Sequence, residues 1–170
     1  MGSFRMKFKL EVATAEDAAG LVSLRAAVNE HLTSQFGKGY WASGMTEKGV
    51  LFAMRRGTVY VARDSQKPIA TLTLSTRKPW AIDTTHFSAS TRPLYLTSME
   101  VSPDCQRKGV GRQCLEEACR IAKEWPADAI RLDAFDAAAG AGGFYRKCGF
   151  REVGRATYRT APLIYFEMLV

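Results

Sequence analysis

The stretch PDCQRKGVGRQCLEE, Pro103–Glu117, decides the fold class of this 170-residue chain. It follows an alternating segment, LYLTSMEV (Leu94–Val101), and runs into a helical pattern that Pro126 ends. The apolar positions on one face of that helix are Val110, Cys114, Ala118, Ile121 and Trp125. A strand, a glycine loop and a helix in this order leave backbone N–H groups at the helix N-terminus, where the dipole also favours an anion. The stretch therefore predicts a phosphate-binding turn.

The residues of this turn fit an anionic ligand. Gly109 and Gly111 remove side chains where a ligand approaches the backbone closely. The surrounding donors and positive charges are Gln106, Arg107, Lys108 and Arg112. A Walker loop is excluded because G-x-x-x-x-G-K-[ST] occurs nowhere in the chain. A dinucleotide loop lacks its third glycine, where Cys114 stands, although Asp133 falls near the position of its ribose acid. A tight turn without any ligand remains the plain alternative.

The rest of the chain alternates helical and strand patterns without a repeat or linker. Helices are expected at 14–36, 46–56 and 142–147, a hairpin at 58–63 and 69–76, and strands at 1–14, 129–135, 150–155 and 163–169. This order predicts one α/β (α+β) domain over residues 1–170, with a mixed sheet and helices on both faces. Residues 77–93 form a long loop, which is functional or poorly ordered in most compact domains, and its aromatic residues favour order.

Composition excludes several classes of function. No run of 18 apolar residues occurs, and the alternating N-terminus is unlike a signal peptide, so we expect a cytoplasmic protein without a membrane partner. Four cysteines without a C-x-x-C pair and two distant histidines predict reduced thiols and no metal. The net charge of +7 lacks the clustered basic stripe of nucleic-acid-binding proteins, so no nucleic-acid partner is expected.

Two motifs resemble one family. QRKGVG, Gln106–Gly111, is similar to the Q/R-x-x-G-x-G/A motif of GNAT-type N-acetyltransferases, and FYRKCGF, Phe144–Phe150, is similar to the family's later F-Y-x-x-x-G-F signature. They stand in the family's order, with one helix and one strand between them. The resemblance covers Leu94 to the C-terminus, and the first ninety residues match only in element order. It implies a GNAT-like domain with a central, mostly antiparallel sheet of about seven strands.

The resemblance also implies acetyl-CoA as the cofactor. The pantetheine arm would lie along the strand at Met99 and Val101. The pyrophosphate would rest on the loop formed by Gln106, Arg107, Lys108, Gly109, Val110, Gly111 and Arg112. The family often has an Asn about seven residues before its tyrosine, and this chain has Ala138 there, so Asp136 or backbone would replace that contact or it would be absent.

Tyr145 matches the family's proton donor, and a phenol with a pKa near 10 is protonated at neutral pH. Its plain alternative is a buried aromatic on a short helix. The general base stays open between Glu100, Asp133 and a water chain through Thr97 or Tyr95. Strand alternation puts Glu100 on the face opposite Met99 and Val101, unless a bulge reverses it.

Acceptor selection in such folds comes from the early helices and the long loop. The residues that we expect there are Phe36, Tyr40, Trp41, Trp80, Asp83, Tyr95 and Thr97. Aromatic rings with a carboxylate suit a cationic amine. The alternatives are that the tryptophans only anchor loops and that Asp83 caps a turn.

The prediction is thus an acetyl-CoA-dependent N-acetyltransferase that acts by direct attack of a small-molecule, amino-acid or peptide amine. The alternative functions are a catalytically silent acyl-CoA-binding or regulatory module and a dinucleotide-binding protein. Homodimers are common among similar proteins, and the sequence leaves monomer and homodimer open.

Overall fold

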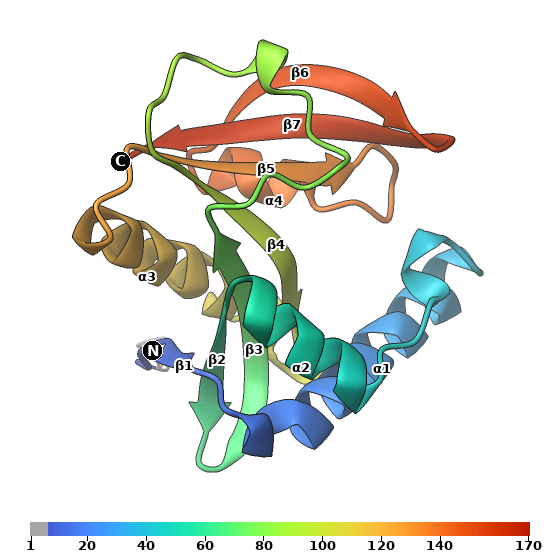
Figure 1. Cartoon of the computed structure of the whole chain (residues 1–170). Helices are drawn as coiled ribbons and strands as arrows, with labels where there is room; N and C mark the ends of the chain where they lie inside the picture. Colours follow the sequence, from blue (N-terminus) through green and yellow to red (C-terminus); the bar gives the residue numbers. More distant parts are fainter. Residues whose placement is uncertain (1–6) are drawn as a thin grey trace, which may run out of the picture. The chain divides into compact units, whose positions relative to one another are not determined.

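The computed structural model describes residues 7–170 (Figure 1). These residues form two compact units. Unit 1 contains the described residues up to Thr73 together with Ser98–Ala118. Unit 2 contains Leu74–Thr97 and Cys119–Val170. The chain passes from one unit to the other within strands and a helix, so the units are not successive domains along the sequence.

The strands belong to one seven-stranded sheet with the order β1-β2-β3-β4-β5-β7-β6. They are β1 (Glu11–Val12), β2 (Thr58–Asp64), β3 (Lys67–Ser75), β4 (Pro93–Val101), β5 (Ala129–Phe135), β6 (Arg151–Tyr158) and β7 (Ala161–Leu169). β1 pairs antiparallel with β2, and β7 pairs antiparallel with both β5 and β6. β4 and β5 run parallel, as the helical connection between them requires. The predicted class, a mixed and mostly antiparallel sheet with helices, is confirmed.

Capping residues stand at the ends of the two helices of the N-terminal half. They are α1 (Ala18–Phe36), α2 (Glu47–Arg56), α3 (Val110–Glu124) and α4 (Gly142–Lys147), with short 3-10 turns η1 (Ala15–Asp17), η2 (Tyr40–Ala42), η3 (Thr84–His86) and η4 (Pro103–Cys105). Before α1, the Thr14 N–H donates to Asp17 Oδ2 at 2.8 Å, and Gly37 ends the helix at φ +75°. Thr46 caps α2 by accepting from the Gly49 N–H at 3.1 Å.

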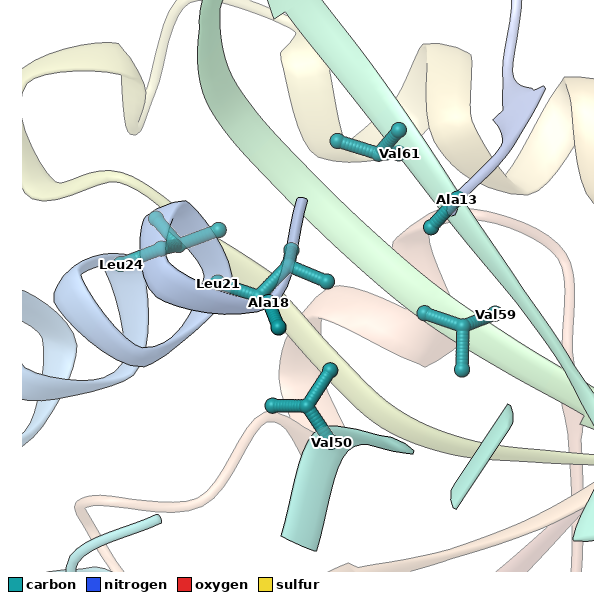
Figure 2. Close-up of a cluster of buried hydrophobic side chains, with 7 residues drawn as sticks. All are labelled: Ala13, Ala18, Leu21, Leu24, Val50, Val59 and Val61. Carbon is teal, nitrogen blue, oxygen red and sulfur yellow. The ribbon is translucent and has the colours of Figure 1, made fainter. Parts of the chain in front are cut away.

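The core of unit 1 lies between α1, α2 and β2 (Figure 2). Figure 2 shows its buried members, which are Ala13, Ala18, Leu21, Leu24, Val50, Val59 and Val61. The helical spacing of Leu21 and Leu24 turns both side chains toward the strand, and alternation puts Val59 and Val61 on the strand face that meets them. This packing fixes α1 against β2.

One buried cluster of unit 2 includes residues of the loop that precedes β4. Its members are Ile82, Phe87, Tyr95, Leu163 and Tyr165. The loop is therefore ordered, as expected, and η3 lies within it. Trp80 is 86% exposed, so the loop is anchored by Ile82 and Phe87 instead of by this tryptophan.

Two sequence predictions need correction. Residues 1–6 of the predicted first strand lie outside the described residues, and in the remainder only Glu11–Val12 is a strand. The segment before it is held by helix side chains instead: Gln113 Nε2 donates to the Phe8 carbonyl at 2.9 Å. At the other end of the chain, β6 continues to Tyr158, three residues further than predicted, because its pairing with β7 extends to the Tyr158↔Ala161 pair.

Candidate active site

The predicted phosphate loop lies in unit 1, between β4 and α3. Arg107 and Gly109 both adopt left-handed backbone, with φ of +58° and +82°. A Cβ on Gly109 would meet nothing within 4 Å, so conformation and not space is what favours glycine there. Gln106 Nε2 donates to the Val101 carbonyl at 3.1 Å, which ties the loop to the end of the strand. Residues 106–109 are exposed and Val110 is buried, so the helix N-terminus is fixed while the loop remains accessible.

A cavity of about 330 Å³ opens beside this loop. Its lining residues are Asp64, Lys67, Ile69, Ser102, Asp104, Cys105, Lys108 and Val110. The Ser102 N–H donates to the Ile69 carbonyl at 2.8 Å, so the floor of the cavity is hydrogen-bonded backbone. An exposed donor loop, a helix N-terminus and lysines at an adjoining cavity are together suited to a phosphorylated ligand.

The end of β4 carries the two predicted pantetheine contacts and the candidate base. Ser98 has φ +51°, a left-handed conformation outside regular strand geometry. Met99 and Val101 are half-buried, whereas Glu100 is buried. Glu100 pairs with Arg25 of α1, at 2.7 Å between Oε1 and Nη1. Burial raises the pKa of the Glu100 carboxyl above its ordinary value, and Arg25 partly offsets this effect.

Tyr145 lies in unit 2, on α4, where it is buried against the rings of Phe150 and Phe166 at centroid distances of 5.7 and 5.8 Å. Gly149, at φ +91°, ends this turn and returns the chain to β6. Burial raises the pKa of the Tyr145 phenol, and the nearby Asp133 and Cys148 raise it further. The phenol is therefore protonated throughout the physiological pH range and can donate a proton.

Asp133 lies on β5, directly opposite Tyr165 of β7. Burial raises the pKa of the Asp133 carboxyl above its ordinary value. The Asp133 charge contributes to the raised pKa of the Tyr145 phenol, so the two residues interact electrostatically within unit 2.

The loop that departs from the family pattern is closed by backbone. Asp136, the predicted substitute for the missing asparagine, forms an ion pair with Arg155 at 3.0 Å. A Cβ on Gly140 would lie 1.7 Å from the Phe135 carbonyl oxygen, so only glycine fits this turn. The sequence analysis missed this requirement, although the DAAAGAGG run carries the signal.

The predicted acceptor residues fall in different surroundings. In unit 2, Trp80 is exposed, Thr97 is half-buried, and the buried Tyr95 accepts from Arg131 Nη1 at 3.4 Å. Asp83 caps η3 by accepting from the Thr85 hydroxyl and N–H at 2.7 and 3.0 Å, and these bonds lower its pKa.

The aromatic residues of unit 1 form a separate cluster. Phe36 and Trp41 contact edge to face at 6.4 Å, and Trp41 Nε1 donates to Thr33 Oγ1 at 3.2 Å. Trp41 therefore anchors the end of α1, whereas Tyr40 is 55% exposed.

The seven-stranded mixed sheet, with a glycine-containing loop and a helix after β4, has the element order that the sequence analysis associated with GNAT-type acetyltransferases. The chain matches the model of the Acetyltransferase (GNAT) family over residues 25–150, and it belongs to this family. Its members are acyltransferases.

Solved structures share the fold at low sequence identity. An acetyltransferase of the GNAT family from Listeria monocytogenes aligns with a TM-score of 0.74 at 15% identity, over 100% of this chain and 99% of that one. The PaiA N-acetyltransferase from Thermoplasma acidophilum, solved with coenzyme A, gives 0.71 at 17%, over 94% and 98%. The ribosomal-protein-S18-alanine N-acetyltransferase from Escherichia coli gives 0.70 at 15%, over 96% and 94%. No curated protein sequence matches the chain significantly.

Two further features bear on the class of site. Within residues 7–170, no helix is both long and apolar enough to cross a membrane. In the same part of the chain, no group of three or more His, Cys, Asp or Glu side chains is placed to hold a metal ion. None of the four cysteines, which all lie within residues 7–170, forms a disulfide; Cys114 is buried, and burial raises its pKa to about 12.

Proposed function

We propose that residues 1–170 act as one N-acetyltransferase domain that moves an acetyl group from acetyl-CoA to a primary amine of a small molecule, an amino acid or a peptide. The observation that carries the proposal is the loop at the N-terminus of α3. Its left-handed residues and exposed donors suit the pyrophosphate of coenzyme A. Membership of the GNAT acetyltransferase family supports acyl transfer as the reaction. The structurally similar PaiA N-acetyltransferase was solved in complex with coenzyme A, which supports coenzyme A as the ligand.

The residues that would hold the cofactor come from two consecutive segments of unit 1. Backbone groups near Met99 and Val101 would accompany the pantetheine arm. The residues from Gln106 to Arg112 would hold the pyrophosphate, with the positive charges of Arg107, Lys108 and Arg112 opposite its negative charge. Burial of Val110 keeps the helix N-terminus in place for this role.

The chemistry is direct attack without a covalent enzyme intermediate. The amine nitrogen forms a bond to the thioester carbonyl carbon, and the carbon–sulfur bond breaks. Tyr145 supplies a proton to the departing thiolate, and the phenolate left behind takes its proton back from solvent. The raised pKa keeps the phenol protonated before the reaction, although it also makes the phenol a weaker acid. The proton lost by the amine goes to a carboxylate or to water.

Glu100 and Asp133 are the two carboxylates proposed for this proton. Both have a raised pKa because of burial, which makes each carboxylate a better proton acceptor near neutral pH. Glu100 forms an ion pair with Arg25, and this pairing makes the Glu100 carboxylate a weaker base. Asp133 interacts with Tyr145, so it is also placed to influence the phenol's proton.

The test measures release of free coenzyme A thiol from acetyl-CoA over a panel of small amines, amino acids and peptides. Turnover with at least one amine, lost in Tyr145→Phe, is the expected result. Binding of acetyl-CoA without turnover of any amine would favour the silent acyl-CoA-binding module. A thermal-shift comparison addresses the third function: stabilisation by coenzyme A and none by NAD is expected, and the reverse would favour a dinucleotide-binding protein.

A further inference from the structure

The loop between β3 and β4, residues 76–92, is held in unit 2 at three places. Near its start, the Tyr165 hydroxyl donates to the Ala81 carbonyl and accepts from the Asp83 N–H. Near its end, the Asp128 carboxylate accepts from Ser90, Thr91 and Arg92. The third place, in the middle, is a buried ion pair.

This ion pair joins Arg131 of β5 to Glu167 of β7, at 3.1 Å between Nε and Oε2. The two side chains are only 6% and 1% exposed. Arg131 Nη2 donates to the Ser88 carbonyl at 2.7 Å, and its guanidinium carbon lies 4.9 Å from the centroid of the Phe87 ring. Glu167 Oε1 accepts from the Ser88 hydroxyl and, at 3.4 Å, from the Ser88 N–H. Both charged groups therefore bind the loop as well as each other.

Sheet stability does not by itself account for this pair. Arg131 and Glu167 stand directly opposite each other in the β5–β7 register. Two apolar side chains in such a position stabilise strand pairing at least as well, because the desolvation penalty of two buried charges offsets most of their mutual attraction. An apolar pair could not supply the bonds to Ser88. It would also lack the Arg131 bond to the Tyr95 hydroxyl at 3.4 Å and the Glu167 ion pair with Arg151 at 3.7 Å, but only the bonds to Ser88 reach the loop. The specific consequence of the ion pair is thus a fixed loop.

The loop has an exposed tip on this fixed base. Trp80 is 86% exposed, although Ile82, two residues later, is 2% exposed. Lys78 Nζ closes the turn by donating to the carbonyls of Pro79 and Ile82 at 3.1 and 2.8 Å. Asp83 follows, with its carboxylate held by Thr85. The Trp80 indole and the Asp83 carboxylate are therefore carried by a loop segment whose backbone is held by hydrogen bonds from Lys78 and Tyr165.

We propose that Arg131 and Glu167 are positioning residues: they fix the β3–β4 loop as a preformed wall that selects the acceptor amine through Trp80 and Asp83. The part that concerns the acceptor rests on the proposed function. The loop is then a rigid surface and not a lid that closes on the substrate. Loosening it weakens acceptor binding and leaves the acyl-transfer step intact, because the loop supplies no group to that step.

The experiment uses the full chain with the double substitution Arg131→Met/Glu167→Leu, which keeps the site filled. It removes the bonds to Ser88, together with the Arg131–Tyr95 hydrogen bond and the Arg151–Glu167 ion pair. Hydrogen exchange of the amides in residues 81–92 should become at least about tenfold faster, as expected for the loss of several hydrogen bonds in one segment. The acceptor KM should rise severalfold while kcat and the KM for acetyl-CoA stay at wild-type values. A general loss of folded protein would instead change all of these quantities together.

The matched control is Arg120→Met/Glu124→Leu, which removes an exposed ion pair of α3 at 2.8 Å and should change neither exchange in the loop nor KM. If Arg131→Met/Glu167→Leu unfolds, Glu167→Gln is used instead, because it keeps the shape of the side chain and weakens its bonds to Ser88. Hydrogen exchange in residues 81–92 of this variant then tests the positioning role. Wild-type exchange rates in residues 81–92 of a folded variant would overturn the positioning role. If the wild-type protein turns over no amine, the proposed function fails, and hydrogen exchange still tests the positioning role.

Discussion

Arg25 Nη1 lies 2.7 Å from Glu100 Oε1, so an ion pair joins α1 to β4 within unit 1. The Glu100 side chain is 7% exposed, whereas that of Arg25 is 27% exposed, so the carboxylate bears most of the desolvation. Arg25 Nε is itself buried and has no hydrogen-bond partner among the described residues. Glu100 therefore depends on a single cation to remain charged.

Arg25→Met should leave the Glu100 charge buried without its partner and lower the free energy of unfolding at pH 8 by about 3 kcal/mol. The pKa of Glu100 is raised in the folded protein, and loss of Arg25 raises it further. The native state then holds the proton more tightly than the unfolded chain, so stability falls as pH rises above the ordinary value of 4.5 and recovers as pH falls toward it. Urea unfolding at pH 5 and pH 8 measures the difference. An equal loss at both pH values would contradict the dependence on the Glu100 charge.

Tyr145→Phe removes only a hydroxyl from a ring that stays packed against Phe150 and Phe166. We expect kcat to fall by about 10²-fold or more, as for loss of a general acid, with the affinity for coenzyme A unchanged. Because the pKa of Tyr145 is raised above its ordinary value of 10.0, ionisation of this phenol should not lower the wild-type rate between pH 7 and 9. Steady-state kinetics over this pH range checks both statements. A variant with wild-type kcat would remove Tyr145 from the mechanism.

Replacing each proposed base, Asp133 or Glu100, with its neutral amide shows which of the two carboxylates accepts the proton. If one of these residues accepts the amine's proton, its amide variant should lose the fall in kcat/KM at low pH, which is the acidic limb of the pH profile. Both pKa values are raised by burial, so this limb lies above the ordinary carboxylate range. The other amide variant serves as the control in the same buffers. If both variants keep the acidic limb, the proton passes to water.

Local sequence was sufficient for the elements that carry the candidate site. The bounds of β5 and α4 agree with the predicted ranges 129–135 and 142–147, because alternation, glycine and proline act within a few residues. The left-handed backbone at Ser98 and Arg107 could not be predicted in the same way, because neither residue is glycine. Their conformations are imposed by the surrounding strand and helix.

Long-range partners were the other part that the sequence could not supply. Arg25 stands among Leu21, Leu24 and Val28 of α1, and its partner Glu100 lies on β4, far along the chain, so no local pattern indicated the ion pair. Arg131 falls within the predicted strand 129–135, and nothing local indicates its partner Glu167, which lies 36 residues away. Trp80 was expected in the loop, and its exposure follows from packing by Ile82 and Phe87, which composition does not reveal.

Gly111→Val places a branched side chain in the first turn of α3, where we propose that the pyrophosphate contacts backbone. Coenzyme A binding should be abolished, while the fold should survive, because valine in a helix costs less than about 1 kcal/mol relative to alanine. Gly44→Val is the matched control in unit 1, since a Cβ at Gly44 would meet nothing within 4 Å. Isothermal titration with coenzyme A compares the two variants. Retained affinity in a folded Gly111→Val protein would overturn the placement of the pyrophosphate.

Gly140→Ala and Gly143→Ala test the loop that stands where the family often has asparagine. A Cβ at residue 140 would lie 1.7 Å from the Phe135 carbonyl oxygen, and backbone cannot move away without distorting the end of β5. A Cβ at residue 143 would meet nothing within 4 Å and would favour the helical conformation of α4. Gly140→Ala should therefore lower the free energy of unfolding by about 2 kcal/mol or more, and Gly143→Ala should leave it unchanged or raise it by about 0.5–1 kcal/mol. Thermal and urea unfolding of the two variants measure these effects, and equal stability would show that the turn at Gly140 adapts to a side chain.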